Sequence, residues 1–213
     1  MYDGPLLPRQ ENDWPAFHAC MRQHDWRGAY QLLGEGLEVK QALQVRFVFT
    51  FGAQMSDEDY WHLVRDAYKN AFRGLDALTT HQIRWLFTSR GGIERLMDGD
   101  ERKALKEFDD AKILYRGYHD ERRLRRFSWT THEQNAARFA LLWHDIDGGT
   151  PMIARARAPK SSVLVLWSFE AEVVADPDHV LVLETYPVPE RYWPMFQYED
   201  SFRERFGRNP KTD

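Results

Sequence analysis

Cysteine and long apolar runs are both scarce in this sequence. Cys20 is the only cysteine among 213 residues, so the chain can form neither an internal disulfide nor a cluster of thiolate metal ligands. Cys20 lies in an apolar helical stretch, where we expect a buried structural thiol. No apolar run approaches the roughly 20 residues that a membrane span needs, and the first residues show no signal-peptide pattern. We therefore expect a soluble, cytoplasmic protein with no membrane contact.

Neither sign of charge dominates the sequence. The chain has 29 Lys and Arg against 33 Asp and Glu, a net charge of −4, which provides no global attraction to nucleic acid. The histidines show no H-E-x-x-H spacing, and His144, Asp145 and Asp147 do not complete a calcium-loop pattern. We predict that the protein binds no metal ion.

Helical patterns extend from residue 12 to about residue 108. The clearest follows Ser56, where three acidic residues precede an apolar stripe. The stripe consists of Tyr60, Leu63, Val64, Ala67, Tyr68 and Ala71. The stretch from Gln44 to Phe51 is either a strand or a buried helix. We predict a helical region over residues 1–108, to which the pattern assigns no role.

After Asp110 the apolar period changes to two. Short strands are predicted at residues 113–118, 127–130, 152–158, 163–167, 170–175 and 180–186. One helix, from about Glu133 to Trp143 with Thr131 as its N-cap, should turn Ala136, Phe139, Ala140 and Trp143 inwards. Many short strands with one helix indicate an α+β domain whose sheets are largely antiparallel. We place this core at residues 109–190, followed by a tail, 191–213, that packs on it around Phe196, Phe202 and Phe206.

Two glutamates lie one residue apart in the apolar run 163–174. In an extended strand, Glu170 and Glu172 would project from the same face about 7 Å apart. Two carboxylates on one wall of a cleft suit catalysis. Taken alone, however, the pair also fits the solvated acidic face of an edge strand.

The glutamates follow two other short motifs. The three motifs, in chain order, are Leu114-Tyr115-Arg116-Gly117, Phe127-Ser128-Trp129-Thr130 and Glu170-Ala171-Glu172-Val173-Val174. Over residues 110–185 this combination resembles the R-S-E class of ADP-ribosyltransferases. The resemblance implies short, largely antiparallel strands in two packed sheets. It also implies an enzyme that transfers ADP-ribose from NAD to a macromolecular acceptor and releases nicotinamide.

The resemblance implies separate roles for the two acids. Glu172 would hydrogen-bond the ribose 2′-hydroxyl and stabilise the positive charge that develops on the sugar. Glu170 would orient or deprotonate the incoming nucleophile. In this family a glutamate at that position is associated with arginine acceptors, which favours protein arginine as the acceptor. RNA or DNA modification, as by a toxin or phage-defence protein, is the alternative.

The resemblance implies that four further residues bind NAD. Arg116 would clamp a phosphate or ribose, although a strand-end arginine can instead pair with a local acid such as Asp109 or Asp110. The backbone of Gly117 would approach the nicotinamide, although a glycine also suits a plain turn. Ser128 and Thr130 would brace the pocket, or they are ordinary strand residues.

Aromatic and basic residues flank these motifs. Tyr115 and Trp129 alternate with Arg116 and Ser128, so we expect both in the core on the opposite sheet face. Trp167 and Phe169 precede the acids, where the family has a loop that contacts the acceptor; burial is the alternative for each. A basic cluster would attract phosphates or is a solvated loop. It consists of Arg122, Arg123, Arg125 and Arg126.

A non-catalytic module is the competing hypothesis from another class. In that case the fold would bind a nucleotide or a partner, and the helical half would be the interaction surface. In the enzyme, the same half could recruit targets, stabilise the fold or accept an inhibitory partner protein. Release of nicotinamide from NAD would separate the two hypotheses.

Overall fold

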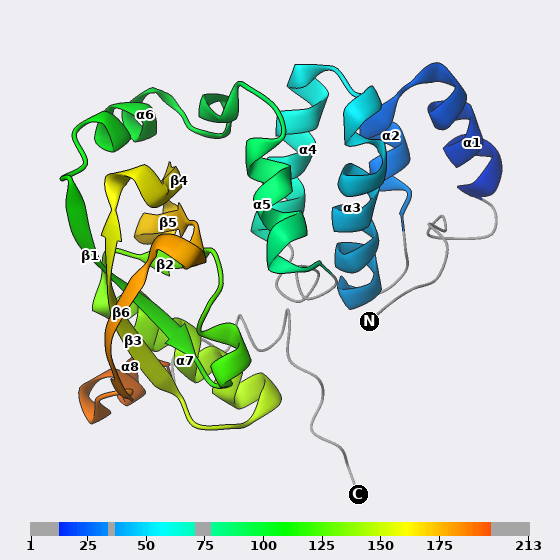
Figure 1. The fold of residues 1–213 in the computed structure, drawn as a ribbon. Helices are drawn as coiled ribbons and strands as arrows, with labels where there is room; N and C mark the ends of the chain where they lie inside the picture. Colours follow the sequence, from blue (N-terminus) through cyan, green and yellow to red (C-terminus); the bar gives the residue numbers. More distant parts are fainter. Residues whose placement is uncertain (1–12, 34–36, 71–77, 197–213) are drawn as a thin grey trace, which may run out of the picture. The chain divides into compact units, whose positions relative to one another are not determined.

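The computed structural model describes residues 13–33, 37–70 and 78–196. The chain is α+β and divides into two compact units, residues 1–96 and residues 97–213. The first unit is helical and the second contains a sheet (Figure 1). Across those described ranges, no helix is both long enough and apolar enough to cross a membrane.

The first unit is built from helices. They are α1 (Trp14–Gln23), α2 (Trp26–Gln31), α3 (Leu37–Phe51), α4 (Asp57–Asn70) and α5 (Thr80–Thr88). Residues 44–51, whose pattern fits either a strand or a buried helix, are helical and belong to α3. Its side chains at Phe47 and Val48 are fully buried, so the apolar run reflects a buried helix rather than a strand.

Helix α4 confirms the predicted apolar stripe. Tyr60, Leu63 and Val64 are buried, as are Ala67 and Tyr68, while Ala71 lies outside the described residues. Its start also matches the prediction, because the hydroxyl of Ser56 accepts a hydrogen bond from the backbone amide of Asp59 at 3.1 Å.

The second unit combines helices with a single sheet. Its helices are α6 (Gly99–Lys106), α7 (Glu133–Asp147) and α8 (Trp193–Phe196). Its strands are β1 (Ala111–Tyr118), β2 (Ser128–Thr130), β3 (Met152–Pro159), β4 (Val163–Trp167), β5 (Glu172–Ala175) and β6 (Leu181–Pro187). All neighbouring strands are antiparallel, in the order β4-β5-β2-β1-β3-β6.

The expected pair of packed sheets is wrong, because the strands form one six-stranded sheet. Two three-stranded halves meet between β1 and β2, whose register is defined at the pair Tyr115 and Thr130. By contrast, β1 and β3 pair along the whole length of β1. Alternation along a strand shows which residues share a face, but it does not encode how neighbouring strands are joined.

The two faces of the sheet bury different side chains. Helix α7 covers one face, mainly over β1, as the green helix beside that strand in Figure 1 shows. Tyr115 packs on this α7 face, whereas Trp129 is buried on the opposite face. The prediction that both lie on one face is wrong. Cross-strand partners share a face, and Tyr115 pairs with Thr130 rather than with Trp129.

Helix α7 begins at Glu133 as predicted, but its N-cap and its C-terminal end differ from the prediction. Its N-cap is His132, not Thr131, and the cap makes no side-chain hydrogen bond. The helix continues past Trp143 to Asp147 and ends at Gly148, whose φ of 77° is in the left-handed region that favours glycine.

The inward-facing residues of α7 are partly as predicted. Ala136 and Ala140 are buried, and Phe139 and Trp143 are half-buried. Phe202 and Phe206, which were predicted to pack the C-terminal tail on the core, lie outside the described residues.

Candidate functional site

Ser128 and Glu172 lie next to each other on β2 and β5. The strands pair with Thr130 opposite Glu172 and Ser128 opposite Val174. The Ser128 hydroxyl donates a hydrogen bond to Glu172 Oε1 at 2.6 Å, the short distance expected of a carboxylate acceptor. Both side chains are half-buried. Strand pairing therefore brings together two residues that the motifs predict to share one site.

Arg116 joins this pair through backbone contacts. Its Nε donates to the carbonyl of Arg123 at 2.7 Å, and its Nη1 donates to the carbonyl of Ser128. Alternation puts the Cβ of Arg116 on the sheet face opposite Tyr115, whereas cross-strand pairing puts the side chains of Ser128 and Glu172 on the same face as Tyr115. The guanidinium meets the backbone of Ser128 at the seam between β1 and β2. Arg116 thus contacts the backbone of Ser128, and the side chain of Ser128 contacts Glu172.

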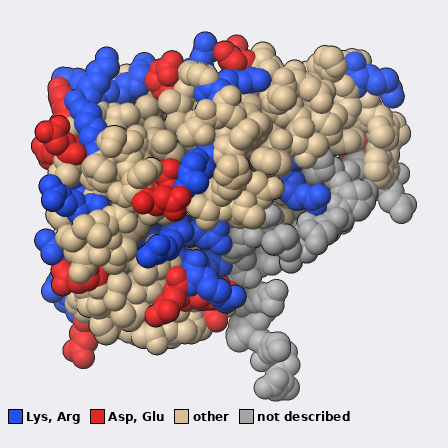
Figure 2. Space-filling model, viewed as in Figure 1, with Lys and Arg blue, Asp and Glu red and all other residues tan. Residues whose placement is uncertain are grey.

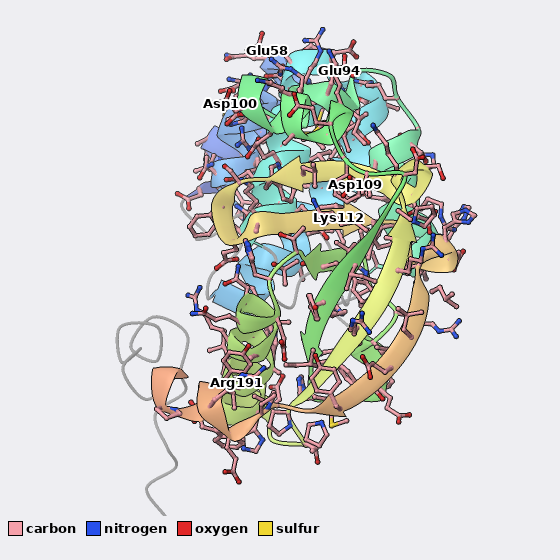
Figure 3. The ribbon with its side chains drawn as sticks, turned by 90° about the vertical axis from the view of Figure 1, so that its left-hand side faces the viewer. Glu58, Glu94, Asp100, Asp109, Lys112 and Arg191 are labelled. Carbon is pink, nitrogen blue, oxygen red and sulfur yellow. The ribbon has the colours of Figure 1, made fainter. Side chains whose placement is uncertain are left out.

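Asp109 is one of the two local acids suggested as partners of Arg116, and it lies beside Lys112. Figure 3 shows Asp109 and Lys112 near each other at the start of β1, with 4.0 Å between Lys112 Nζ and Asp109 Oδ2. Arg116 donates to the carbonyls of Arg123 and Ser128. These contacts hold the planar guanidinium in a fixed orientation.

Glu170 does not lie on a strand, so the prediction of an extended pair with Glu172 is wrong. It belongs to a short 3-10 turn, Phe169–Ala171, which we call the Glu170 turn. The backbone of Glu170 is left-handed, with φ 62° and ψ 11°, and Ala171 also has a positive φ of 49°. Such conformations cost about 1 kcal/mol or more each for residues with a side chain, and they concentrate at functional sites.

Two side chains hold the strained residue in place. The carbonyl of Glu170 accepts hydrogen bonds from Thr130 Oγ1 at 3.0 Å and from Asn135 Nδ2 at 2.7 Å. Its carboxylate forms an ion pair with Arg138, with 3.2 Å between Nη1 and Oε1. Thr130, predicted to brace a nicotinamide pocket, thus braces the Glu170 turn. The sequence did not identify Asn135 and Arg138 as partners of Glu170, because a helical pattern does not show which distant residues a helix contacts.

The start of the Glu170 turn is fixed by Glu101 of α6. Glu101 is only 5% exposed, and its Oε1 accepts from the backbone amide of Ser168 at 2.8 Å and from the Ser168 hydroxyl at 3.1 Å. Its Oε2 caps the helix by accepting from the amide of Asp98 at 2.9 Å. The Asp98-x-x-Glu101 spacing is a visible capping-box signal, but the contact with Ser168 has no signal in the sequence.

Gly117 lies where β1 contacts α7 most closely. A Cβ built on Gly117 would fall 1.8 Å from the carbonyl oxygen of Ala136 and 2.6 Å from the amide nitrogen of Ala140. Both atoms belong to the helix backbone, which cannot rotate away as a side chain can. The absence of a side chain is therefore required for packing, and a contact between Gly117 and nicotinamide stays a prediction.

The two aromatics before the acids have opposite environments. Trp167 is 2% exposed and belongs to the interior, whereas Phe169 is 71% exposed within the Glu170 turn. An aromatic ring at that exposure gains little from folding. Of the two, only Phe169 is placed to touch a bound molecule.

The predicted basic cluster is partly neutralised by nearby acids. Arg122 donates from Nε to both carboxylate oxygens of Asp120, at 2.9 and 3.1 Å. These side-chain hydrogen bonds lower the pKa of Asp120 to about 2. Arg123 lies 3.8 Å from Asp147 and stacks over the Trp143 ring at 4.6 Å. Figure 2 shows acidic side chains interspersed with basic ones on the visible face, unlike a continuous phosphate-binding surface.

His119 is buried beside this cluster. Its side chain is 7% exposed, and its Nε2 lies 3.6 Å from Asp147. Burial lowers the pKa of His119 below its usual 6.5, and the guanidinium of Arg123 lowers it further. Asp147 acts in the opposite direction but is outweighed. The lowered pKa favours the neutral ring at pH 7, which weakens the contact with Asp147 as an ion pair.

His119 should make the protein less stable in acid. The unfolded chain takes up this proton near pH 6.5 and the folded chain only at lower pH, so the free energy of unfolding falls as the pH drops below 6.5. The loss levels off below the folded-state pKa. Urea unfolding at about pH 7.5 and about pH 5 should show a smaller pH dependence for His119→Gln than for the wild type. Equal pH dependence in the two proteins would contradict the lowered pKa.

Comparisons with protein-family models, with curated proteins and with solved structures find no match. The chemistry of the site is therefore inferred from its own residues. Within residues 13–33, 37–70 and 78–196, no group of three or more ligating side chains could hold a metal ion. What the site presents is a fixed carboxylate at Glu172, a second acid in a strained turn at Glu170, and the immobilised guanidinium of Arg116.

Proposed function

We propose that the second unit is an NAD-dependent mono-ADP-ribosyltransferase that modifies a macromolecular acceptor, with protein arginine favoured. The observation that carries this proposal is that Ser128 contacts both other residues, Arg116 through its backbone carbonyl and Glu172 through its hydroxyl. These residues come from β1, β2 and β5. Residues that act on a single dinucleotide must be neighbours, and Ser128 is a neighbour of both Arg116 and Glu172.

Glu172 is the catalytic residue in this proposal. Cleavage of the bond between ribose and the nicotinamide nitrogen builds positive charge on the sugar, and a carboxylate beside the sugar stabilises that charge. The hydrogen bond from Ser128 orients the carboxylate before substrate binds. No reorganisation is then needed as the charge develops, which is the main advantage of a preformed site.

Arg116 would contact the dinucleotide on the phosphate or ribose side. The carbonyls of Arg123 and Ser128 engage two of its five N–H donors. A guanidinium fixed in this way presents its charge in one direction, as recognition of a phosphate requires. Its position at the seam of β1 and β2 makes the sheet itself the support of the site.

Glu170 and Phe169 would contact the acceptor. Glu170 lies two residues before the catalytic acid, on a turn rather than on a strand. Phe169 exposes 71% of its surface next to it. An exposed aromatic beside an acid suits a macromolecular substrate that brings a cationic side chain.

Glu170→Gln should separate transfer from hydrolysis. Removing the charge weakens activation of the acceptor, whereas water still reaches the ribose, so transfer to a guanidine acceptor should fall by about 10²-fold or more. NAD hydrolysis should fall much less. Both rates are measured on the same samples, as modified acceptor and as free nicotinamide. Equal losses of the two activities would contradict an acceptor-specific role.

The proposed function is tested by incubating the full chain with NAD. Release of nicotinamide supports the enzyme, and intact NAD supports the non-catalytic module. Labelled NAD, mixed with separate protein and RNA fractions, then shows which polymer gains the label. Label on RNA alone would replace the arginine acceptor by the nucleic-acid alternative.

A further inference from the structure

Glu170 already binds a guanidinium, that of Arg138 from α7. The Nη1 of Arg138 lies 3.2 Å from Glu170 Oε1 and donates a hydrogen bond to it. The side chains are 36% and 22% exposed, so solvent and solutes reach the pair. A guanidinium N–H donated to a carboxylate is the contact by which Glu170 would recognise an arginine acceptor.

The backbone of the Glu170 turn is held by other contacts. Thr130 and Asn135 bind the Glu170 carbonyl. The amide of Ala171 donates to the carbonyl of Ser168 at 3.1 Å, and the carbonyl of Ala171 accepts from the amide of Thr131 at 3.2 Å. The ion pair with Arg138 therefore acts on the carboxylate, while the shape of the turn is set by these bonds.

We propose that Arg138 occupies the acceptor position at Glu170 and competes there with the incoming arginine. This inference rests on the proposed function. Partly exposed ion pairs are weak, so an acceptor guanidinium can displace Arg138. Arg138 is then a specificity-determining residue, because it raises the KM for arginine acceptors and has no part in the attack of water on NAD.

Replacing Arg138 should change the KM for the acceptor and leave the other kinetic constants in place. With agmatine as a small guanidine acceptor, Arg138→Ala should lower the KM about two- to fivefold, the range that one partly exposed pair accounts for. The kcat for transfer and the rate of NAD hydrolysis should stay at the wild-type level. Arg138→Lys, which keeps the positive charge, should have a KM close to that of the wild type.

A matched control is available on the other half of the sheet. Arg155 of β3 pairs with Glu184 at 3.0 Å, with side chains 39% and 54% exposed. Arg155→Ala removes an ion pair of the same kind from the same unit and should leave the agmatine KM unchanged. An unchanged or raised KM in Arg138→Ala would overturn the proposal. So would a fall in the transfer kcat with hydrolysis intact, which would make Arg138 a positioning residue for Glu170.

Agmatine binding without NAD separates this inference from the proposed function. Calorimetry should show tighter binding of agmatine to Arg138→Ala than to the wild type, and the gain should disappear when Glu170→Gln is added. Equal binding to the wild type and Arg138→Ala overturns the competition, whatever the enzymatic activity. If the wild type releases no nicotinamide while the binding gain is present, the proposed function fails and the guanidinium site at Glu170 stands.

Discussion

Glu172→Gln is expected to abolish both NAD hydrolysis and transfer. The substitution keeps the size of the side chain and an oxygen that can accept from Ser128, whose hydroxyl lies 2.6 Å from Glu172 Oε1. It removes the negative charge that would stabilise the sugar cation. Loss of a preorganised electrostatic contact typically lowers kcat by about 10²- to 10³-fold, and we expect at least this loss. The measurement is nicotinamide release under saturating NAD.

Two controls accompany this variant. Its thermal unfolding midpoint should stay close to that of the wild type, because the side chain is half-buried and keeps its volume. Ser128→Ala should retain more activity than Glu172→Gln, since it loses only the orientation of the carboxylate. Near-normal turnover in Glu172→Gln, from a folded protein, would remove Glu172 from the catalytic role.

Gly117→Ala is expected to be the most damaging small substitution in the second unit. The added methyl group would stand 1.8 Å from the carbonyl oxygen of Ala136 and 2.6 Å from the amide of Ala140. Relief requires α7 to move away from β1, which breaks packing around the buried Ile153. Forced overpacking of this kind costs about 3 kcal/mol or more. Urea unfolding of the variant measures this loss, and failure to fold would be its extreme form.

Gly99→Ala is the matched control for this prediction. Gly99 begins α6 in the same unit, and no neighbouring atom lies within 4 Å of the Cβ position. Alanine is the better helix former, so this variant should be unchanged or more stable by about 0.4–1 kcal/mol. Similar stabilities for Gly117→Ala and Gly99→Ala would show that β1 and α7 can separate at little cost.

Local patterns predicted the elements of the fold well. The strand at Val163–Trp167 has the predicted bounds, and the stripe of α4 is buried as expected. Periodicity works here because burial of a face requires apolar residues at the spacing of the element, and every residue of the element carries part of that signal. The expected second sheet did not form, because the strands join in one sheet.

Glu170 and Glu172 show what local alternation does not predict. Alternation placed Glu170 and Glu172 on one strand, but Glu170 is held in a left-handed turn by Thr130 and Asn135. These partners precede it by 40 and 35 residues. A strained backbone is stable only when distant contacts compensate for it, and no local pattern contains those contacts.

The residue types, their order and the period of each element were thus readable along the chain, because they depend on neighbours a few positions away. The strand register, the seam between β1 and β2, the tight fit of Gly117 on α7 and the pairing of Arg138 with Glu170 came only from the folded molecule. Each of these depends on which surfaces meet in space. That choice is made by packing over the whole unit, where a one-residue shift in pairing would move every side chain to the other face.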